Sequence, residues 1–168
     1  IYGEDHPEYS YPLNSLGMFY DDQGRLEEAK QLIREAFHIR EKYFGLDNPI
    51  TIISIGNMGN ISISQRNYAL AVYYYKMSNE LGLTMRGAWH HGSAIEVNNL
   101  GYAYNKQKLY KKALEKYEAS NAVLRKINNP FDPFYSSSYS NLALTQEKMG
   151  ESSNAAINFQ KMTEIVGV

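Results

Sequence analysis

The chain has 168 residues, of which 43% are hydrophobic and 21% are charged, and its formal net charge is -1. This balance is typical of a globular domain, and the small net charge excludes a global field that draws the protein to nucleic acid or to an acidic membrane. The lack of cysteine excludes a disulfide framework, thiolate catalysis and cysteine-ligated zinc. No apolar run reaches the roughly 20 residues that cross a bilayer, and no secretory signal is visible. We therefore expect a cytoplasmic protein, either free or associated with the cytoskeleton.

The main feature of the sequence is an internal repeat with a period of 42 residues and no gaps. Small residues and large apolar residues recur at this spacing, which is what closely packed helices require. The recurring positions are Leu16, Met58, Leu100 and Leu142; Gly17, Gly59, Gly101 and Ala143; Ala29, Ala71, Ala113 and Ala155; and Ile33, Tyr75, Tyr117 and Phe159. The period predicts a single domain over residues 1–168 with repeats at 2–43, 44–85, 86–127 and 128–168.

Each repeat carries the pattern of two helices joined by a tight turn. In the first repeat, Leu13, Leu16, Gly17 and Tyr20 stand at i, i+3, i+4 and i+7, which is one face of an α-helix. Gly24 follows, and glycine adopts a positive φ without steric cost, so we expect the turn there. The same reading along the chain predicts an all-α fold with helix pairs at about 9–22 and 25–43, 50–64 and 67–84, 92–106 and 109–127, and 133–148 and 151–166.

These positions resemble the tetratricopeptide repeat (TPR), whose signature runs W-x2-L-G-x2-Y and then A-x3-F. The third repeat matches it as Val97-x2-Leu100-Gly101-x2-Tyr104, followed by Ala113-x3-Tyr117. The 42-residue length is similar to the kinesin light chain type of repeat, whose linker the segment Tyr2-Gly3-Glu4-Asp5-His6-Pro7 resembles. The resemblance implies a right-handed α-solenoid of four TPR units. It also implies that the first helix of each pair lines a concave groove that grips short extended peptides.

The first-helix residues that the packing stripe leaves over are predicted to face this groove. They are rich in asparagine, whose amide both donates and accepts, so it can hold a peptide backbone whatever the peptide's sequence. Neighbouring tyrosines supply apolar pockets. The predicted peptide-binding residues are Tyr11, Asn14, Met18, Asn57, Asn60, Asn98, Asn99, Tyr102, Asn105 and Asn141. The alternative is that the asparagines only hold neighbouring helices in register.

No pattern in the sequence points to catalysis, to a cofactor or to a metal. The four histidines are His6, His38, His90 and His91, and no third ligand stands at metal spacing beside the adjacent pair. There is no phosphate-binding glycine loop and no G-x-S-x-G nucleophile motif. We interpret the lysines of the third repeat as a solvated face rather than a nucleic-acid site. Trp89 is predicted to fill a gap between repeats, the alternative being an anchor for a partner.

The sequence therefore predicts a non-catalytic adaptor or scaffold that binds a protein or peptide. Two other functions stay open. One is a structural component of a large cytoskeletal or ciliary assembly, held through Tyr73 and Tyr74 on a second helix. The other is the sensing or regulatory arm of a larger multidomain protein. The chain opens in a linker and its last helix is apolar without a polar cap, so we expect a fragment or a larger assembly formed through the terminal repeats.

Overall fold

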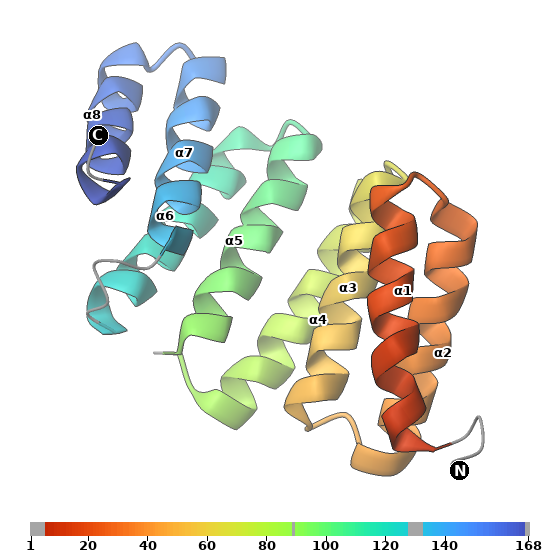
Figure 1. Ribbon diagram of the computed structural model, residues 1–168. Coiled ribbons are helices and arrows are strands. Elements are labelled where there is room, and N and C mark those ends of the chain that lie inside the picture. The colour runs from red at the N-terminus through yellow and green to blue at the C-terminus, as the bar shows by residue number, and fades with distance from the viewer. Residues whose placement is uncertain (1–5, 89, 128–132, 167–168) are drawn as a thin grey trace. The chain divides into compact units, whose positions relative to one another are not determined.

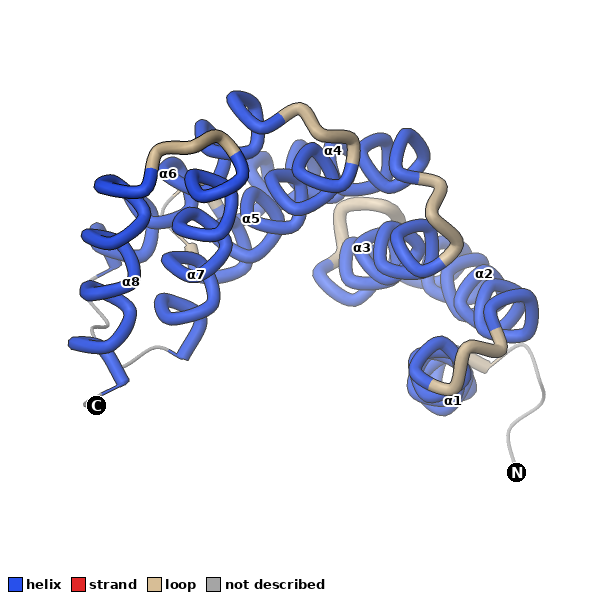
Figure 2. The backbone as a smooth tube through the Cα atoms, turned by 90° about the horizontal axis from the view of Figure 1, so that it is seen from above, coloured by secondary structure: helices blue, strands red, loops and turns tan. Residues whose placement is uncertain are grey.

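The computed structural model describes residues 6–88, 90–127 and 133–166, which form a short 3-10 helix followed by α-helices (Figure 1). The elements are η1 (Pro7–Tyr9), α1 (Ser10–Asp22), α2 (Leu26–Phe44), α3 (Pro49–Ser64), α4 (Tyr68–Arg86), α5 (His91–Lys106), α6 (Tyr110–Ile127), α7 (Pro133–Lys148) and α8 (Ser152–Val166). No strand occurs in these three stretches (Figure 2). The all-α prediction is confirmed, and every predicted helix end lies within two residues of the observed one.

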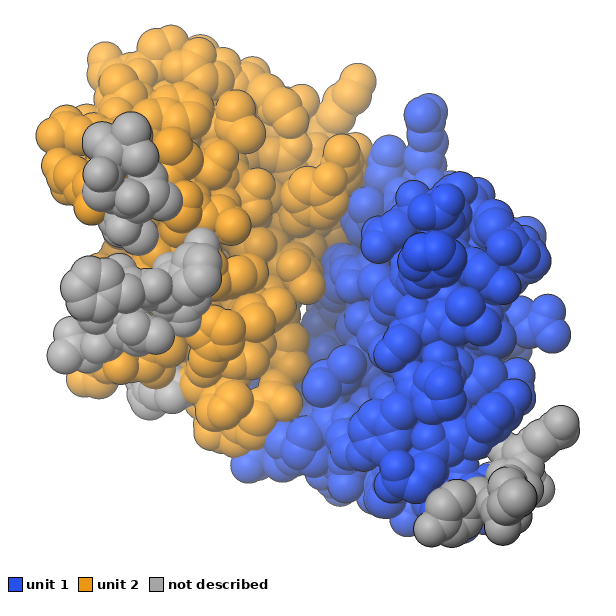
Figure 3. Space-filling view, viewed as in Figure 1, with its two compact units in different colours: residues 1–85 blue, residues 86–168 orange. Residues whose placement is uncertain are grey.

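The chain divides into two compact units, residues 1–85 and 86–168 (Figure 3). The division falls where the second predicted repeat ends and the third begins. The helix pairs α1–α2 and α3–α4 belong to unit 1, apart from Arg86 at the end of α4, and the pairs α5–α6 and α7–α8 belong to unit 2. The single domain over residues 1–168 stays a prediction.

The two helices of a pair touch where the sequence repeats its smallest residues. A Cβ added to Gly59 would lie 2.5 Å from Cε1 of Tyr75, and one added to Gly101 would lie 2.8 Å from Cε1 of Tyr117. These separations are too short for a methyl group, so only glycine leaves room for each tyrosine ring beside the first helix. The repeated alanines of the second helices are fully buried, at Ala29, Ala71, Ala113 and Ala155.

The turn inside every repeat uses one residue in the left-handed region of backbone space. Gly24 has φ of 75° as predicted, and Gly150 has φ of 79°. Arg66 and Lys108, at the same position in the second and third repeats, have φ of 58° and 61°. The left-handed region is unfavourable for a residue with a Cβ, so the middle two turns carry local strain that the outer two avoid.

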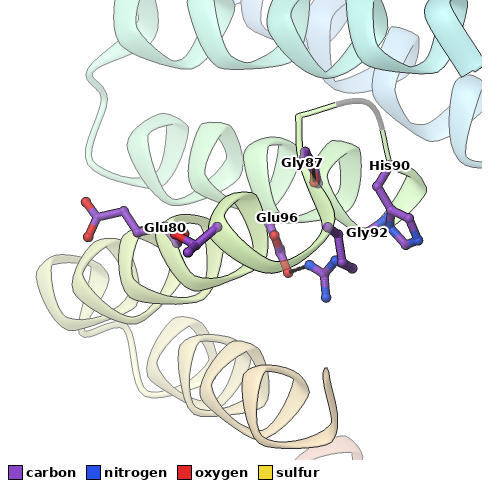
Figure 4. Close-up of polar contacts among 8 residues, drawn as sticks. Glu80, Gly87, His90, Gly92 and Glu96 are labelled. Carbon is purple, nitrogen blue, oxygen red and sulfur yellow. Dashed lines mark hydrogen bonds and ion pairs between the residues drawn. The ribbon is translucent and has the colours of Figure 1, made fainter. Parts of the chain in front are cut away.

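Two of the four histidines act as helix caps. Nδ1 of His6 accepts a hydrogen bond from the backbone N–H two residues further on, at 3.2 Å. Nδ1 of His90 accepts in the same way from the N–H of Gly92, at 3.0 Å (Figure 4). Oδ1 of Asn48, one period after His6, does the same at 3.0 Å. These side chains satisfy N–H groups that the first turn of a helix leaves open. Trp89, adjacent to the second of these caps, lies outside the described residues.

One prediction about the core is wrong. Leu16 was expected in the buried stripe of the first helix, but it is 41% exposed, whereas Leu100 and Leu142 at the same repeat position are buried. Leu142 lies on α7, which packs against the preceding α6. No α-helix precedes α1 within the described residues, so no preceding α-helix there covers Leu16.

Candidate functional site

In unit 1, a chain of side-chain hydrogen bonds crosses the surface that α1 and α3 share, which we call the first-helix surface of unit 1. Nδ2 of Asn57 donates to Oδ1 of Asn14 at 3.0 Å, and Nδ2 of Asn60 donates to Oδ1 of Asn57 at 3.4 Å. The hydroxyl of Tyr75, on α4, closes the chain by donating to Oδ1 of Asn60 at 2.7 Å. The three amides are half-buried, so they are held in place and still reach solvent.

Arg40, on α2, holds the other end of this chain. It is buried, and its guanidinium donates to Oδ1 of Asn14 at 3.3 Å, to Oγ of Ser54 at 2.7 Å and to Oγ of Ser10 at 3.1 Å. The ring of Tyr11 lies 5.3 Å from its charge centre. Removal from water lowers the pKa of Arg40 below its ordinary value, because burial disfavours the charged form. The described partners are neutral, so the positive charge is balanced by hydrogen bonds and a ring face rather than by a carboxylate.

Unit 2 carries a related set of contacts on its own first-helix surface, formed by α5 and α7. Nδ2 of Asn141 donates to Oδ1 of Asn98 at 3.5 Å, and Nζ of Lys148 donates to Oδ1 of Asn105 at 2.9 Å. Asn105 also donates through Nδ2 to Thr145. The ammonium of a second lysine, Lys106, lies 4.9 Å from the ring centroid of Tyr102 on the same helix.

The structure separates the predicted binding residues by exposure. Tyr11 is exposed, and eight are half-buried, namely Asn14, Met18, Asn57, Asn60, Asn99, Tyr102, Asn105 and Asn141. Asn98 differs from the expectation that it faces the groove, because it is only 4% exposed and its carbonyl oxygen is bonded within the unit. The side chain of Met18 packs against the buried cluster of Ala29, Ile33 and Ile61, so it helps the core as well as the surface.

Several of these bonds join residues one repeat apart in the chain. Asn14 to Asn57, Asn98 to Asn141 and Asn105 to Lys148 all span 43 residues. The asparagines therefore do hold neighbouring repeats in register, which was the alternative to peptide binding. The two roles are compatible, since an amide has two N–H groups and a carbonyl, and one or two bonds do not exhaust them.

Sequence reasoning missed Arg40 as part of this site. The signal was present, because helical spacing from Ile33 and Ala36 places residue 40 on the buried stripe of the second helix. A cation on such a stripe needs several acceptors. Its acceptors come from α1 and α3, and nothing in the local pattern identifies them.

The described residues offer neither a metal-binding cluster nor a membrane-spanning helix. Within residues 6–88, 90–127 and 133–166 no group of three or more histidine and acidic side chains is placed to hold a metal ion. None of the described helices combines the length and the apolarity needed to cross a membrane.

Comparison with curated proteins finds relatives far longer than this chain. A clustered mitochondria protein homolog of Aspergillus niger is 31% identical over 120 residues, which are 71% of this chain and 10% of the relative. A protein of the same name from Aspergillus fumigatus is 30% identical over 123 residues, 73% of this chain and 9% of the relative. The chain thus spans about a tenth of the length of the curated relatives that it matches.

Solved structures match nearly the whole chain at low identity. BtubC (BKLC) from P. vanneervenii has a TM-score of 0.84 at 20% identity, over 96% of this chain and 65% of that one. A putative kinesin light chain of Podospora anserina with TPR-like repeats has a TM-score of 0.82 at 19% identity, over 95% and 76%. A Rap protein complexed with competence and sporulation factor has a TM-score of 0.86 at 14% identity, over 99% and 44%.

These structural matches establish the fold, including its likeness to kinesin light chain repeats. The sequence itself matches a family model described as the tetratricopeptide repeat over residues 8–81 and 93–166, which covers both units and most of the chain. The chain belongs to the tetratricopeptide-repeat family.

Proposed function

We propose that the chain is a non-catalytic protein-interaction module, an adaptor or scaffold that binds an extended peptide segment of a partner protein through its first-helix surfaces. The observation that carries this proposal is the hydrogen-bonded row of asparagine amides on each surface. Asn14 bonds through its carbonyl oxygen, and its amino group makes no hydrogen bond within the part of the chain that the structure describes. The side chain of Asn99, half-buried on α5, makes no hydrogen bond with any residue that the structure describes.

The arrangement suits a peptide because its donors and acceptors are held in place before the ligand arrives. Asn57 and Asn60 are fixed by bonds to their neighbours and by the hydroxyl of Tyr75. A ligand that meets fixed amides does not have to order them, which lowers the entropic cost of binding. The exposed ring of Tyr11 and the half-buried ring of Tyr102 offer apolar surface beside the amides.

The test is a pull-down with mass spectrometry that compares the wild-type chain with an Asn99→Ala/Tyr102→Ala double variant. Both residues reach the surface, so the helices of unit 2 are expected to keep their circular dichroism. Tyr73→Ala is the matched control, because Tyr73 is 60% exposed on the second helix α4. Partners lost in the double variant and kept in the control support the proposal. Partners kept in the double variant and lost with Tyr73→Ala favour the structural role that uses the second helices.

The curated relatives support a more specific setting for the same module. At 30% identity over 73% of the chain, these repeats match one segment of a clustered mitochondria protein homolog. We propose that the repeats serve as the partner-binding segment of a longer cytoplasmic protein of that kind, either free or associated with the cytoskeleton. Deleting the gene and imaging mitochondria tests this. A collapsed mitochondrial distribution is expected, and an unchanged one contradicts it.

A further inference from the structure

A cavity of about 490 Å³ lies in unit 2 between the second helix α6, the first helix α7 and the second helix α8. Its size is within the range of ligand sites in proteins. It is lined by amide side chains and by the ring of Tyr139, with charged groups of α6 and α8 beside them. All of these elements belong to unit 2. The residues of this cavity are not among those of the first-helix surface.

Asn121, which lines the cavity, has a buried side-chain amide without hydrogen-bond partners among the described residues. The side chain is only 1% exposed, and neither Nδ2 nor Oδ1 has a hydrogen-bond partner among the residues that the structure describes. A buried amide that lacks both partners is costly, so native proteins rarely keep one without use. Two other buried amides in the cavity are paired, since Nδ2 of Asn158 donates to Oε1 of Gln146 at 2.9 Å. Asn121 is therefore the buried amide of this cavity that lacks a hydrogen-bond partner among the described residues.

The charged groups of the cavity are mostly cationic. Nη1 of Arg125 donates to the hydroxyl of Tyr139 at 3.2 Å, and Nζ of Lys161 lies 5.8 Å from the centroid of the same ring. Glu118 is the carboxylate that lines the cavity with them. The two cations are exposed, so they can turn toward a bound anionic group.

The equivalent region of unit 1 contains a much smaller cavity. Counting back 84 residues, or two periods of 42, from the cavity residues gives apolar or aromatic side chains at four of its polar positions. The pairs are Asn121 with Phe37, Asn154 with Leu70, Asn158 with Tyr74, and Lys161 with Met77. The corresponding space in unit 1, lined in part by Leu70 and Tyr74, measures about 20 Å³. The fold therefore does not require the cavity, and unit 2 has it because of its sequence.

We propose that this cavity is a second binding site, for a peptide segment of a partner protein that carries an acidic side chain. In an extended peptide the N–H and the C=O of one residue point to the same side, so together they can pair with Oδ1 and Nδ2 of Asn121, which a carboxylate alone cannot do. The acidic side chain pairs with Lys161 and Arg125 at the edge of the cavity. This site and the first-helix surface of unit 2 are independent.

The test uses the 168-residue chain, labelled with ¹⁵N and titrated with the blocked tripeptide acetyl-Ala-Glu-Ala-amide at low salt. Saturable amide shifts are expected on α6, α7 and α8. The matched probes are acetyl-Ala-Lys-Ala-amide and sodium acetate, and each is expected to bind at least tenfold more weakly. Equal shifts with the lysine peptide or with acetate overturn the proposal. So do shifts that are spread over both units, or no saturable shift on these helices.

Two variants connect the shifts to the residues. Lys161→Met is expected to weaken binding of the glutamate peptide about tenfold, whereas Lys76→Met, an exposed lysine on α4, leaves it unchanged. Asn121→Leu is expected to weaken binding at least tenfold while the thermal midpoint does not fall. Unchanged binding in Asn121→Leu overturns the proposal. Sedimentation that shows self-association, with the same shifts produced by raising the protein concentration alone, also overturns it by making a second copy the occupant.

Discussion

Unit 1 and unit 2 carry equivalent helix pairs 84 residues apart, so nearly every side chain of one has a counterpart in the other. Gly17 and Gly101 both lie where the second helix comes too close for a Cβ. Arg40 of unit 1, however, has Leu124 as its counterpart, and both are buried. The steric positions of the repeat are thus kept, while the buried polar positions differ. We infer that packing defines the fold of each unit and that the polar positions give each unit its own binding properties.

The difference extends to the hydroxyl groups that surround these two residues. Oγ of Ser54 accepts a hydrogen bond from Arg40 at 2.7 Å, but Oγ of the equivalent Ser138 has no partner among the described residues. Asn121 adds two more buried atoms without partners in unit 2. At these positions unit 1 satisfies its buried polar groups from within, whereas unit 2 leaves them open. Elsewhere in unit 1, buried oxygens of Asp21, Thr51 and Asn79 also have no partner among the described residues.

The largest expected effect comes from giving unit 1 the residue that unit 2 has. Arg40→Leu removes the donor for Ser10, Asn14 and Ser54. Oδ1 of Asn14 keeps its bond from Asn57, but the buried hydroxyl oxygens of Ser10 and Ser54 lose the group from which they accept, so we expect a loss of about 3 kcal/mol in stability. Native-state hydrogen exchange measures this, and the loss should fall on amides of unit 1. Arg34→Leu, an exposed arginine on the same helix, is the control and should change stability by less than about 0.5 kcal/mol. Equal effects of the two variants contradict a structural role for the buried guanidinium.

In unit 2, replacing a buried polar side chain by leucine is expected to raise stability. Asn121→Leu removes two buried polar atoms that have no partner and puts an apolar side chain of similar size in their place, so stability should rise by about 2 kcal/mol. Protection from hydrogen exchange along α6 to α8 measures the gain. Asn154→Leu, an exposed position on α8, is the control with little expected change. A fall in stability with Asn121→Leu means that the amide has partners of its own, and it removes the contrast between the units.

Spacing in the sequence was sufficient to predict the helix pairs, because the 42-residue period and the size of each repeated residue act locally. It was not sufficient for Arg40, whose acceptors Ser10 and Ser54 stand 30 and 14 residues away on other helices. The spacing also placed Asn98 at the groove, but the residue is buried. A shift of about one position around the helix separates the groove face from the buried face. The cavity beside Asn121 depends on what three helices leave unfilled, and no pattern within one helix reports that.

Alkaline pH should weaken unit 2 through one buried tyrosine. Burial raises the pKa of Tyr117 above its ordinary value because the charged phenolate is disfavoured in the core, and the counterpart in unit 1 is Ile33, which does not titrate. The stabilisation is fully present below the unfolded pKa of about 10 and is lost as the pH rises above it, at about 1.4 kcal/mol for each pH unit. Denaturant unfolding at pH 9 and pH 11 measures the loss. Tyr117→Phe should reduce the slope, and an unchanged slope in that variant contradicts the assignment.

The smallest expected effect lies in the turns, where the comparison runs between glycine and lysine. Lys108 has φ of 61° at the position that Gly24 occupies with φ of 75°. A left-handed backbone costs a residue with a Cβ about 1–2 kcal/mol, and the extra chain entropy of glycine offsets part of the gain from relieving it, so Lys108→Gly should stabilise the chain by about 0.5–1 kcal/mol. Lys111→Gly, on the exposed side of α6, should have the opposite sign because glycine weakens a helix. Thermal unfolding of both variants measures the two changes in stability. Only strain at the turn predicts that the same lysine-to-glycine substitution raises stability at residue 108 and lowers it at residue 111.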